Sequence, residues 1–249
     1  MGDAPTPRAA SRMEGGTDIR AARPAIMMVG RVMSVKTNPP TRGTERGNPN
    51  ALANDFVYPD PGALVIFPDN HDMSRIFTQL DEDYGLYKIA MAYVLTMRGA
   101  PQIYYGTEIL MANPGTDSHG IIRSDFPGGW QGDLKNAFTG AGLGETERDA
   151  QAYVRTLLKW RQNKVVIHTG ELTHFRPRDG IYVYFRHNEN ESVMVILNKN
   201  DDPSRLQLER FEERLKGYTK ARDVVENTLF TLDDELQVAG RSALVLELR

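Results

Sequence analysis

The densest group of side chains that could do chemistry is the run Phe67-Pro68-Asp69-Asn70-His71-Asp72, which directly follows a short apolar stretch. Asp72 could accept a proton, stabilise a developing positive charge or ligate a metal, and His71 could donate hydrogen bonds to substrate hydroxyls. A local interpretation fits the spacing equally well: Asp72 or Ser74 would cap a short helical turn, and His71 would be a packed imidazole. The residue types alone leave both interpretations open.

A long loop, residues 106 to about 145, carries a second set of polar and aromatic side chains. It is rich in Gly, Asp, Asn and Pro, and loops of this length without structure of their own are usually functional. With the tyrosine just before it, the loop offers these candidates: Tyr105, Glu108, Asp117, Arg123, Asp125 and Trp130.

A third interpretation concerns a cation. Carboxylate oxygens suit calcium, but the acidic residues here lack a recognisable calcium-loop pattern, and the charge run reads more simply as a solvated helix entry. We therefore assign no metal ligand and name no certain cofactor, and calcium stays open. The acidic residues in question are Asp69, Asp72, Asp81, Glu82 and Asp83.

The elements around the first run predict where it lies. Residues 63–67 are a continuous apolar stretch bounded by Pro and Gly, as expected for a buried parallel strand. Apolar residues at helical spacing predict a helix over 84–97, and a second short strand is expected over 102–105, ending at Gly106. Strand, helix and strand form a βαβ unit, whose active-site side chains sit at the carboxyl ends of the strands.

The pattern then predicts one more helix and a change to period two. Thr146 and Asp149 form a capping-box pattern that opens the helix, and from residue 170 the alternation of apolar residues predicts a separate antiparallel β domain. The helix face is expected to contain Ala150, Tyr153, Val154, Leu157, Leu158 and Arg161. A hairpin is expected around Ile181–Phe185 and Val193–Leu197, with further strands near 219–225, 236–238 and 243–248.

Composition sets the domain organisation and excludes several classes of protein. Eight of the 14 prolines lie in residues 1–62, which predicts an irregular segment, followed by α/β structure over 63–169 and the β domain over 170–249. A net charge of -3 argues against a nucleic-acid partner, and the lack of cysteine excludes disulfide scaffolds and thiolate zinc sites. No stretch is apolar enough to cross a membrane and no signal peptide is visible, so the chain as it stands is expected in the cytoplasm.

Two of these motifs point to a family. Phe67–Asp72 and the run Ala100-Pro101-Gln102-Ile103-Tyr104-Tyr105-Gly106-Thr107-Glu108 closely resemble the segments around strands seven and eight of the α-amylase superfamily of glycoside hydrolases. Arg123-Ser124-Asp125-Phe126-Pro127-Gly128-Gly129-Trp130 narrows the likeness to the neopullulanase and cyclomaltodextrinase branch. The resemblance covers about residues 63–249. It implies an α/β plus all-β fold: the last two βα units of a TIM-barrel-type catalytic domain, followed by a C-terminal antiparallel β sandwich.

The resemblance also implies an activity and residue roles. The family cleaves α-glucosidic bonds in starch, maltodextrin, cyclodextrin or pullulan with retention, which needs a nucleophilic carboxylate and an acid about 5–5.5 Å apart. Asp72 matches the family's third carboxylate, which stabilises the transition state, and His71 matches the histidine that contacts the same sugar. The resemblance makes the partner an α-glucan. Asn70, Tyr105, Glu108, Arg123, Asp125 and Trp130 are assigned to substrate binding, with Trp130 able to stack on a sugar face.

The chain departs from the family at the nucleophile and the acid. Neither usual residue has a convincing match, and Arg31 stands where the acid is expected, although arginine has no proton to give at neutral pH. This predicts a truncated hydrolase with impaired or altered catalysis, and the alternative is a non-catalytic glucan-binding or structural fragment. Two βα units leave sheet edges unpaired, so we also expect self-association, element swapping or marginal order.

Overall fold

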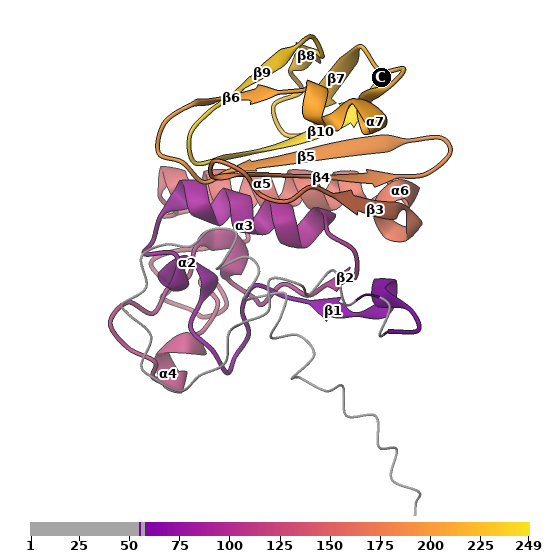
Figure 1. The fold of residues 1–249 in the computed structure, drawn as a ribbon. Helices are drawn as coiled ribbons and strands as arrows, with labels where there is room; N and C mark the ends of the chain where they lie inside the picture. Colours follow the sequence, from indigo (N-terminus) through magenta and orange to yellow (C-terminus); the bar gives the residue numbers. More distant parts are fainter. Residues whose placement is uncertain (1–54, 56–57) are drawn as a thin grey trace, which may run out of the picture.

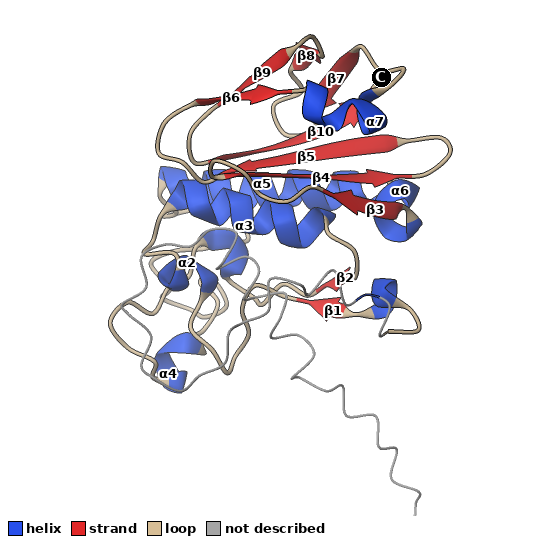
Figure 2. Ribbon diagram, viewed as in Figure 1, coloured by secondary structure: helices blue, strands red, loops and turns tan. Residues whose placement is uncertain are grey.

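The structure is a computed structural model that describes Asp55 and residues 58–249. Most of the expected irregular segment over residues 1–62 therefore lies outside the described residues. Arg31 lies outside them as well. Figure 1 shows the arrangement: a small parallel pair of strands, a layer of helices, and a β sheet that lies on those helices. Figure 2 shows how much of the part between β2 and α5 is loop.

The expected strand, helix and strand order is present, with shorter strands than predicted. β1 (Val65–Ile66) pairs in parallel with β2 (Ala100–Pro101), and α3 (Tyr84–Thr96) connects them. The expectation of a buried strand over 63–67 is wrong in extent, because β1 has no second neighbour among the described residues and Val65 is 37% exposed.

The second strand also lies earlier than expected. Residues 102–105 were predicted to form it, but the chain leaves the sheet after Gln102, whose N–H donates to the Ile66 carbonyl at 2.8 Å. The Tyr104 carbonyl then accepts from the Thr107 N–H at 3.1 Å, which turns the chain into the 3₁₀ turn Thr107–Ile109. Because the Tyr104 carbonyl is bonded within this turn, it does not accept a hydrogen bond from a neighbouring strand, and the strand ends before it.

The helix α3 forms where predicted and is buried on nearly every side. The Asp83 carboxylate caps it by accepting from the Leu86 N–H at 2.8 Å. Its apolar residues surround the whole helix rather than one stripe, which is the pattern of a helix enclosed by other elements. In Figure 1, α3 lies between the sheet and the β1–β2 pair.

Helix α5 (Glu145–Gln162) begins earlier than predicted. Its N-cap is Gly144, whose N–H donates to the Glu147 carboxylate at 2.7 Å, so Thr146 and Asp149 do not form the capping box. Of the expected face, Ala150, Tyr153, Val154 and Leu157 are buried, Arg161 is half-buried and Leu158 is 39% exposed. Arg161 reaches the carbonyls of Leu95 and Gly99 at 2.8 and 3.1 Å and so binds the negative end of α3.

The C-terminal part is antiparallel, as predicted. Six strands form one sheet in the order β3-β4-β5-β10-β7-β8, and β6 and β9 form a separate pair. The sheet strands are β3 (Glu171–His174), β4 (Ile181–His187), β5 (Ser192–Asn198), β7 (Lys220–Asp223), β8 (Leu229–Thr231) and β10 (Ser242–Leu248). The separate pair is β6 (Ser204–Gln207) and β9 (Glu235–Val238).

Strands β4 and β5 are buried on both faces. Tyr182 and Tyr184 of β4 pack in the hydrophobic core that contains α3 and α5. Val183 and Phe185 pack in a second core with β6, β9 and α7 (Glu212–Leu215). The expected alternation of apolar side chains is therefore present in β4. The intervening side chains, however, are tyrosines that pack against the helices instead of facing solvent. One hydrophobic core runs across the expected boundary at residue 169, from α3 and α5 into the sheet.

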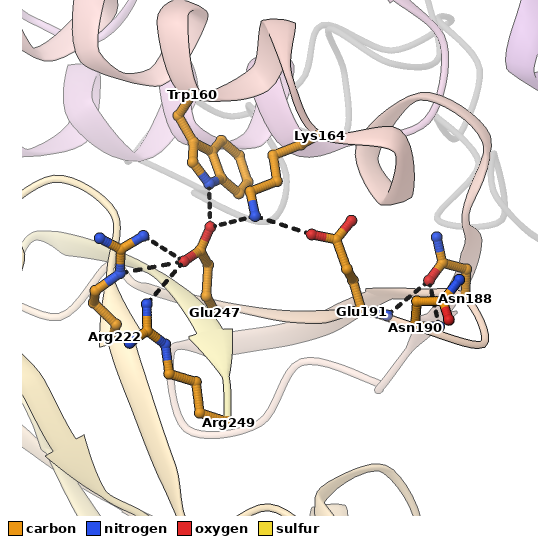
Figure 3. A network of polar contacts seen from close by, with 8 residues as sticks. All are labelled: Trp160, Lys164, Asn188, Asn190, Glu191, Arg222, Glu247 and Arg249. Atoms are coloured by element: carbon orange, nitrogen blue, oxygen red, sulfur yellow. Dashed lines mark hydrogen bonds and ion pairs between the residues drawn. The ribbon is translucent and has the colours of Figure 1, made fainter.

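A polar network joins the end of α5 to the sheet (Figure 3). Glu247 of β10 accepts from the Trp160 indole at 2.7 Å, from Lys164 at 2.8 Å and from Arg222 at 2.6 Å. Lys164 also contacts Glu191 at 3.0 Å, in the turn between β4 and β5. Hydrogen bonds from these donors outweigh partial burial and lower the pKa of Glu247 to about 2.

Three further helices of the described residues are short. They are α2 (Ile76–Gln79), α4 (His119–Ile122) and α6 (Val165–Thr169), with 3₁₀ turns at Pro61–Ala63 and Glu209–Phe211. Among the described residues, no helix is both long and apolar enough to span a membrane.

Candidate functional site

The candidate site lies just beyond the carboxyl end of β1, where His71 and Asp72 meet Arg123. His71 Nε2 is 3.1 Å from Asp72 Oδ2, and Arg123 donates to Asp72 Oδ1 at 2.9 Å. The side chains of His71 and Asp72 are 60% and 56% exposed. The local interpretation, a packed imidazole and a capping Asp72, is therefore wrong, and both groups remain open to a ligand.

Local hydrogen bonds hold these side chains in place. The Asn70 side-chain oxygen accepts from the Asp72 N–H at 2.8 Å, which makes a tight turn at the end of the motif. Arg123 Nε donates to the His71 carbonyl at 3.1 Å, and Arg123 Nη2 contacts His119 Nδ1 at 2.7 Å. Arg123 thus bridges the long loop to both residues, and His119, which sequence reasoning missed, supports it from one helical turn away.

Asp69 anchors the base of the site from a fully buried position. One carboxylate oxygen accepts from the Ile76 N–H at 2.9 Å, so Asp69, rather than Asp72 or Ser74, caps α2. The Thr107 hydroxyl lies 2.9 and 3.0 Å from the two oxygens. Burial raises the pKa of Asp69 to about 6, although these hydrogen bonds and the charge of Arg75 act to lower it.

A pH titration tests this account of Asp69. Because its pKa is higher in the fold than the ordinary value of 3.8, Asp69's contribution to stability decreases as the pH rises from about 4 through 6. We expect the carboxyl ¹³C signal of Asp69, assigned by its loss in Asp69→Asn, to titrate near pH 6. Thr107→Val removes a hydrogen bond to the charged form and should move the midpoint higher, whereas Thr169→Val should not. A midpoint near pH 4 would contradict the burial argument.

Arg75 fills the space behind the site, and sequence reasoning missed it. Its side chain is 1% exposed, and its Nε donates to the Ile122 carbonyl at 3.0 Å while Nη1 donates to the Tyr105 carbonyl. The guanidinium carbon lies 4.2 Å from the centre of the Tyr104 ring. The side-chain oxygen of Asn113, in the long loop, accepts from the Arg75 backbone N–H at 2.8 Å and so joins the loop to the Arg75 backbone.

The other predicted residues are not all gathered at His71 and Asp72. The Tyr105 hydroxyl donates to the Ser124 carbonyl at 2.9 Å, and Asp117 accepts from the Ser74 hydroxyl. Glu108 borders an open groove against α5, and Asp125 is exposed at the surface. Trp130, in the part of the long loop that follows α4, is 68% exposed. The structure therefore brings together Asn70, His71, Asp72 and Arg123, whereas Asp117 is bonded to Ser74.

Two of the acidic residues considered for a cation have their carboxylates bound by the protein itself. Asp83 caps α3 and pairs with Arg241 at 2.6 Å, while Asp69 binds Ile76 and Thr107. Asp81 and Glu82 form a left-handed turn, with φ of 54° and 57°. Within Asp55 and residues 58–249, no group of three His, Cys, Asp or Glu side chains is placed to hold a metal ion.

Comparison with known proteins finds similarity to enzymes of the cyclomaltodextrin and α-amylase type. Residues 172–247 match the model of the cyclo-malto-dextrinase C-terminal domain. A cyclomaltodextrin glucanotransferase of Klebsiella oxytoca is 32% identical over 174 residues, which are 62% of this chain and 25% of that protein. A maltogenic α-amylase of Bacillus acidopullulyticus is 29% identical over 204 residues, which are 78% of this chain and 29% of that protein.

The fold gives the same result. The α-amylase of Geobacillus thermoleovorans, solved with acarbose, superposes with a TM-score of 0.62 at 25% identity, over 80% of this chain and 41% of that one. The chain spans about a quarter of the length of the curated relatives it matches. By its motifs, its C-terminal domain and its fold, the chain resembles the C-terminal part of an α-amylase-superfamily glycoside hydrolase of the neopullulanase and cyclomaltodextrinase type.

Proposed function

We propose that this chain is an α-amylase-type glycoside hydrolase that cleaves α-glucosidic bonds in starch, maltodextrin or cyclodextrin with retention, and that its catalysis is impaired or altered. The observation that carries the proposal is the exposed His71 and Asp72 pair, held by Arg123 at the carboxyl end of β1. In this proposal, residues 63–169 are the last two βα units of a TIM-barrel-type domain, and residues 170–249 are the C-terminal β domain that follows it. The parallel pairing of β1 with β2 supports the barrel assignment.

Asp72 has a defined chemical role in this proposal. A carboxylate that accepts hydrogen bonds from sugar hydroxyls stabilises an oxocarbenium-like transition state, because those bonds strengthen as positive charge develops on the ring. Arg123 fixes the orientation of Asp72 through Oδ1, and His71 lies beside Oδ2. Asn70 sets the turn, and Tyr105, Glu108, Asp125 and Trp130 are proposed to contact more distant sugar units.

A second candidate is a non-catalytic glucan-binding module. It is favoured by the positions of the three long-loop carboxylates that could replace the missing nucleophile and acid, which are Asp125, Glu108 and Asp117. Asp125 is exposed at the surface. Asp117 is bonded to Ser74, and Glu108 lies in the groove against α5. Retaining hydrolysis needs two such groups about 5–5.5 Å apart across the bond. Under this candidate the chain holds maltodextrin without cleaving it.

Binding and hydrolysis measured side by side test both candidates. We expect calorimetry to detect saturable binding of maltoheptaose, and Asp72→Asn to weaken it about 10-fold because a charged hydrogen-bond acceptor is lost. Asp179→Asn, an exposed aspartate of the β domain, should leave binding unchanged. Reducing-end release from soluble starch by pure protein would favour the hydrolase over the binding module. Equal affinity of the wild type and Asp72→Asn would exclude Asp72 from the site.

A further inference from the structure

The contacts of Arg123 use both hydrogens of a single nitrogen atom. Its Nη2 donates to Asp72 Oδ1 at 2.9 Å and lies 2.7 Å from His119 Nδ1. Its Nε donates to the His71 carbonyl at 3.1 Å. An Nη nitrogen of arginine carries two N–H groups in the rigid plane of the guanidinium. The contacts with Asp72 and His119 therefore fix the direction of that plane together.

The contact between Arg123 and His119 requires one protonation state of the histidine. Arginine is always a donor, so the Nδ1 atom of His119 has to be the acceptor. Nδ1 accepts only when it carries no proton, and a neutral imidazole then carries its proton on Nε2. The geometry thus fits neutral His119 in the Nε2–H form.

Protonation of His119 would break this contact. A charged imidazole has an N–H on both nitrogens and no acceptor, so two donors and two positive charges would meet 2.7 Å apart. Arg123 would turn away, and Nη2 would leave Asp72 as well, because the same atom makes both contacts. Histidine is the side chain that changes its charge between about pH 5 and 8, and His119 is exposed to solvent.

His71, the other histidine of the site, responds to protons in a different way. Its Nε2 is 3.1 Å from Asp72 Oδ2. An Nε2–H group donates to a carboxylate in the neutral Nε2–H form and in the charged form, so protonation of His71 keeps its contact and adds an attraction. A release of Asp72 on acidification is therefore specific to His119.

The other charged groups around α4 are engaged elsewhere. Asp117, two residues before His119, accepts from a serine hydroxyl, and Arg75 donates to a carbonyl of α4 at 3.0 Å. Asp69 is buried, and burial raises its pKa to about 6, so it titrates over the same pH range as a histidine. A test of His119 must therefore be separated from the titrations of Asp69 and His71.

We propose that His119 is a positioning residue whose protonation controls the affinity of this site for α-glucan. Neutral His119 holds Arg123 against Asp72, and charged His119 releases it. The inference rests on the proposed function, because the ligand is the one proposed above. Since the three side chains are exposed, the expected effect on affinity is about 3–5-fold.

Calorimetry with maltoheptaose at pH 8 and pH 5 tests the proposal. Asparagine can place its Oδ1 where histidine has Nδ1 and does not titrate, so His119→Asn should keep the affinity at pH 8. Between pH 8 and pH 5, the wild type should lose about 3–5-fold more affinity than His119→Asn. His119→Leu, which has no acceptor, should bind weakly at both pH values. His168→Asn, at another exposed histidine, should follow the wild type. Equal pH dependence of the wild type and His119→Asn would overturn the proposal.

An NMR titration without glucan separates this proposal from the proposed function. The side-chain Nε–H signal of Arg123, assigned by its absence in Arg123→Lys, should move with the His119 ring signals in the wild type. That component should be missing in His119→Asn. If it is missing but no protein binds maltoheptaose, the proposed function fails and the positioning role stands. If maltoheptaose binds and the Arg123 signal titrates identically in both proteins, the positioning role is wrong.

Discussion

Replacing Arg75 with methionine is expected to lower the free energy of unfolding by about 2–5 kcal/mol, because two buried carbonyl acceptors each lose a donor at a cost of about 1–3 kcal/mol. The Arg75 side chain is 1% exposed and donates to the carbonyls of Ile122 and Tyr105. Both carbonyls belong to the segment that presents Arg123 to Asp72, so methionine fills the volume but leaves two acceptors without donors. The loss should appear in urea unfolding followed by circular dichroism.

The same change should reach the candidate site. Arg75 lowers the pKa of Asp69 by its charge, so Arg75→Met should move the Asp69 titration above pH 6. The Tyr105 to Arg123 segment should loosen, and maltoheptaose binding should weaken with it. Arg205→Met is the matched control, because Arg205 is 71% exposed and pairs with Glu235 at the surface. An effect of Arg75→Met as small as that control, below about 1 kcal/mol, would contradict this account of the network.

Replacing Glu247 with alanine is expected to cost about 3 kcal/mol at pH 7, since its pKa of about 2 lies well below the ordinary 4.5. The Glu247 side chain is 10% exposed and is bound by Trp160, Lys164 and Arg222. Without it, two cations face each other across the junction of α5 and the sheet. Urea unfolding at pH 7 measures the loss.

The pH dependence gives a sharper test of Glu247. A carboxylate with a lowered pKa contributes its full stability above pH 4.5 and loses it as the pH falls from 4.5 through about 2. The wild type should therefore lose stability over this window, and Glu247→Ala should lose about 3 kcal/mol less. Glu235→Gln, at a surface pair, should follow the wild type. Parallel pH curves for wild type and Glu247→Ala would refute the assignment.

Several elements could be predicted because their information is local. Apolar residues over 84–96 recur at helical spacing and form α3, and the alternation at 181–185 and 193–197 forms β4 and β5. The run from Asp69 to Asp72 follows a strand directly, so its position at a carboxyl end was readable from neighbouring residues. Local patterns misplaced the start of α5, because a glycine with a glutamate three residues later is a weaker signal than a threonine.

The support of the site could not be predicted, because each contact joins residues far apart in the chain. Arg75 reaches Ile122, Thr107 reaches Asp69, and Arg123 reaches Asp72, and no spacing rule relates them. A buried arginine also runs against the usual exposure of that residue type. Only once α3 and the long loop are packed does the pocket exist that accepts the guanidinium.

The main elements and the motif that carries His71 and Asp72 could be inferred from the amino-acid sequence, since both depend on side-chain types at short separations. Contacts between distant segments instead set the two-residue length of β1 and β2, the enclosure of β4 and β5 on both faces, and the burial of Asp69 rather than Asp72. Strand length and burial depend on which neighbours are present to cover a backbone edge or a side chain. Those neighbours come from distant parts of the chain, and their arrangement follows from packing that no local pattern encodes.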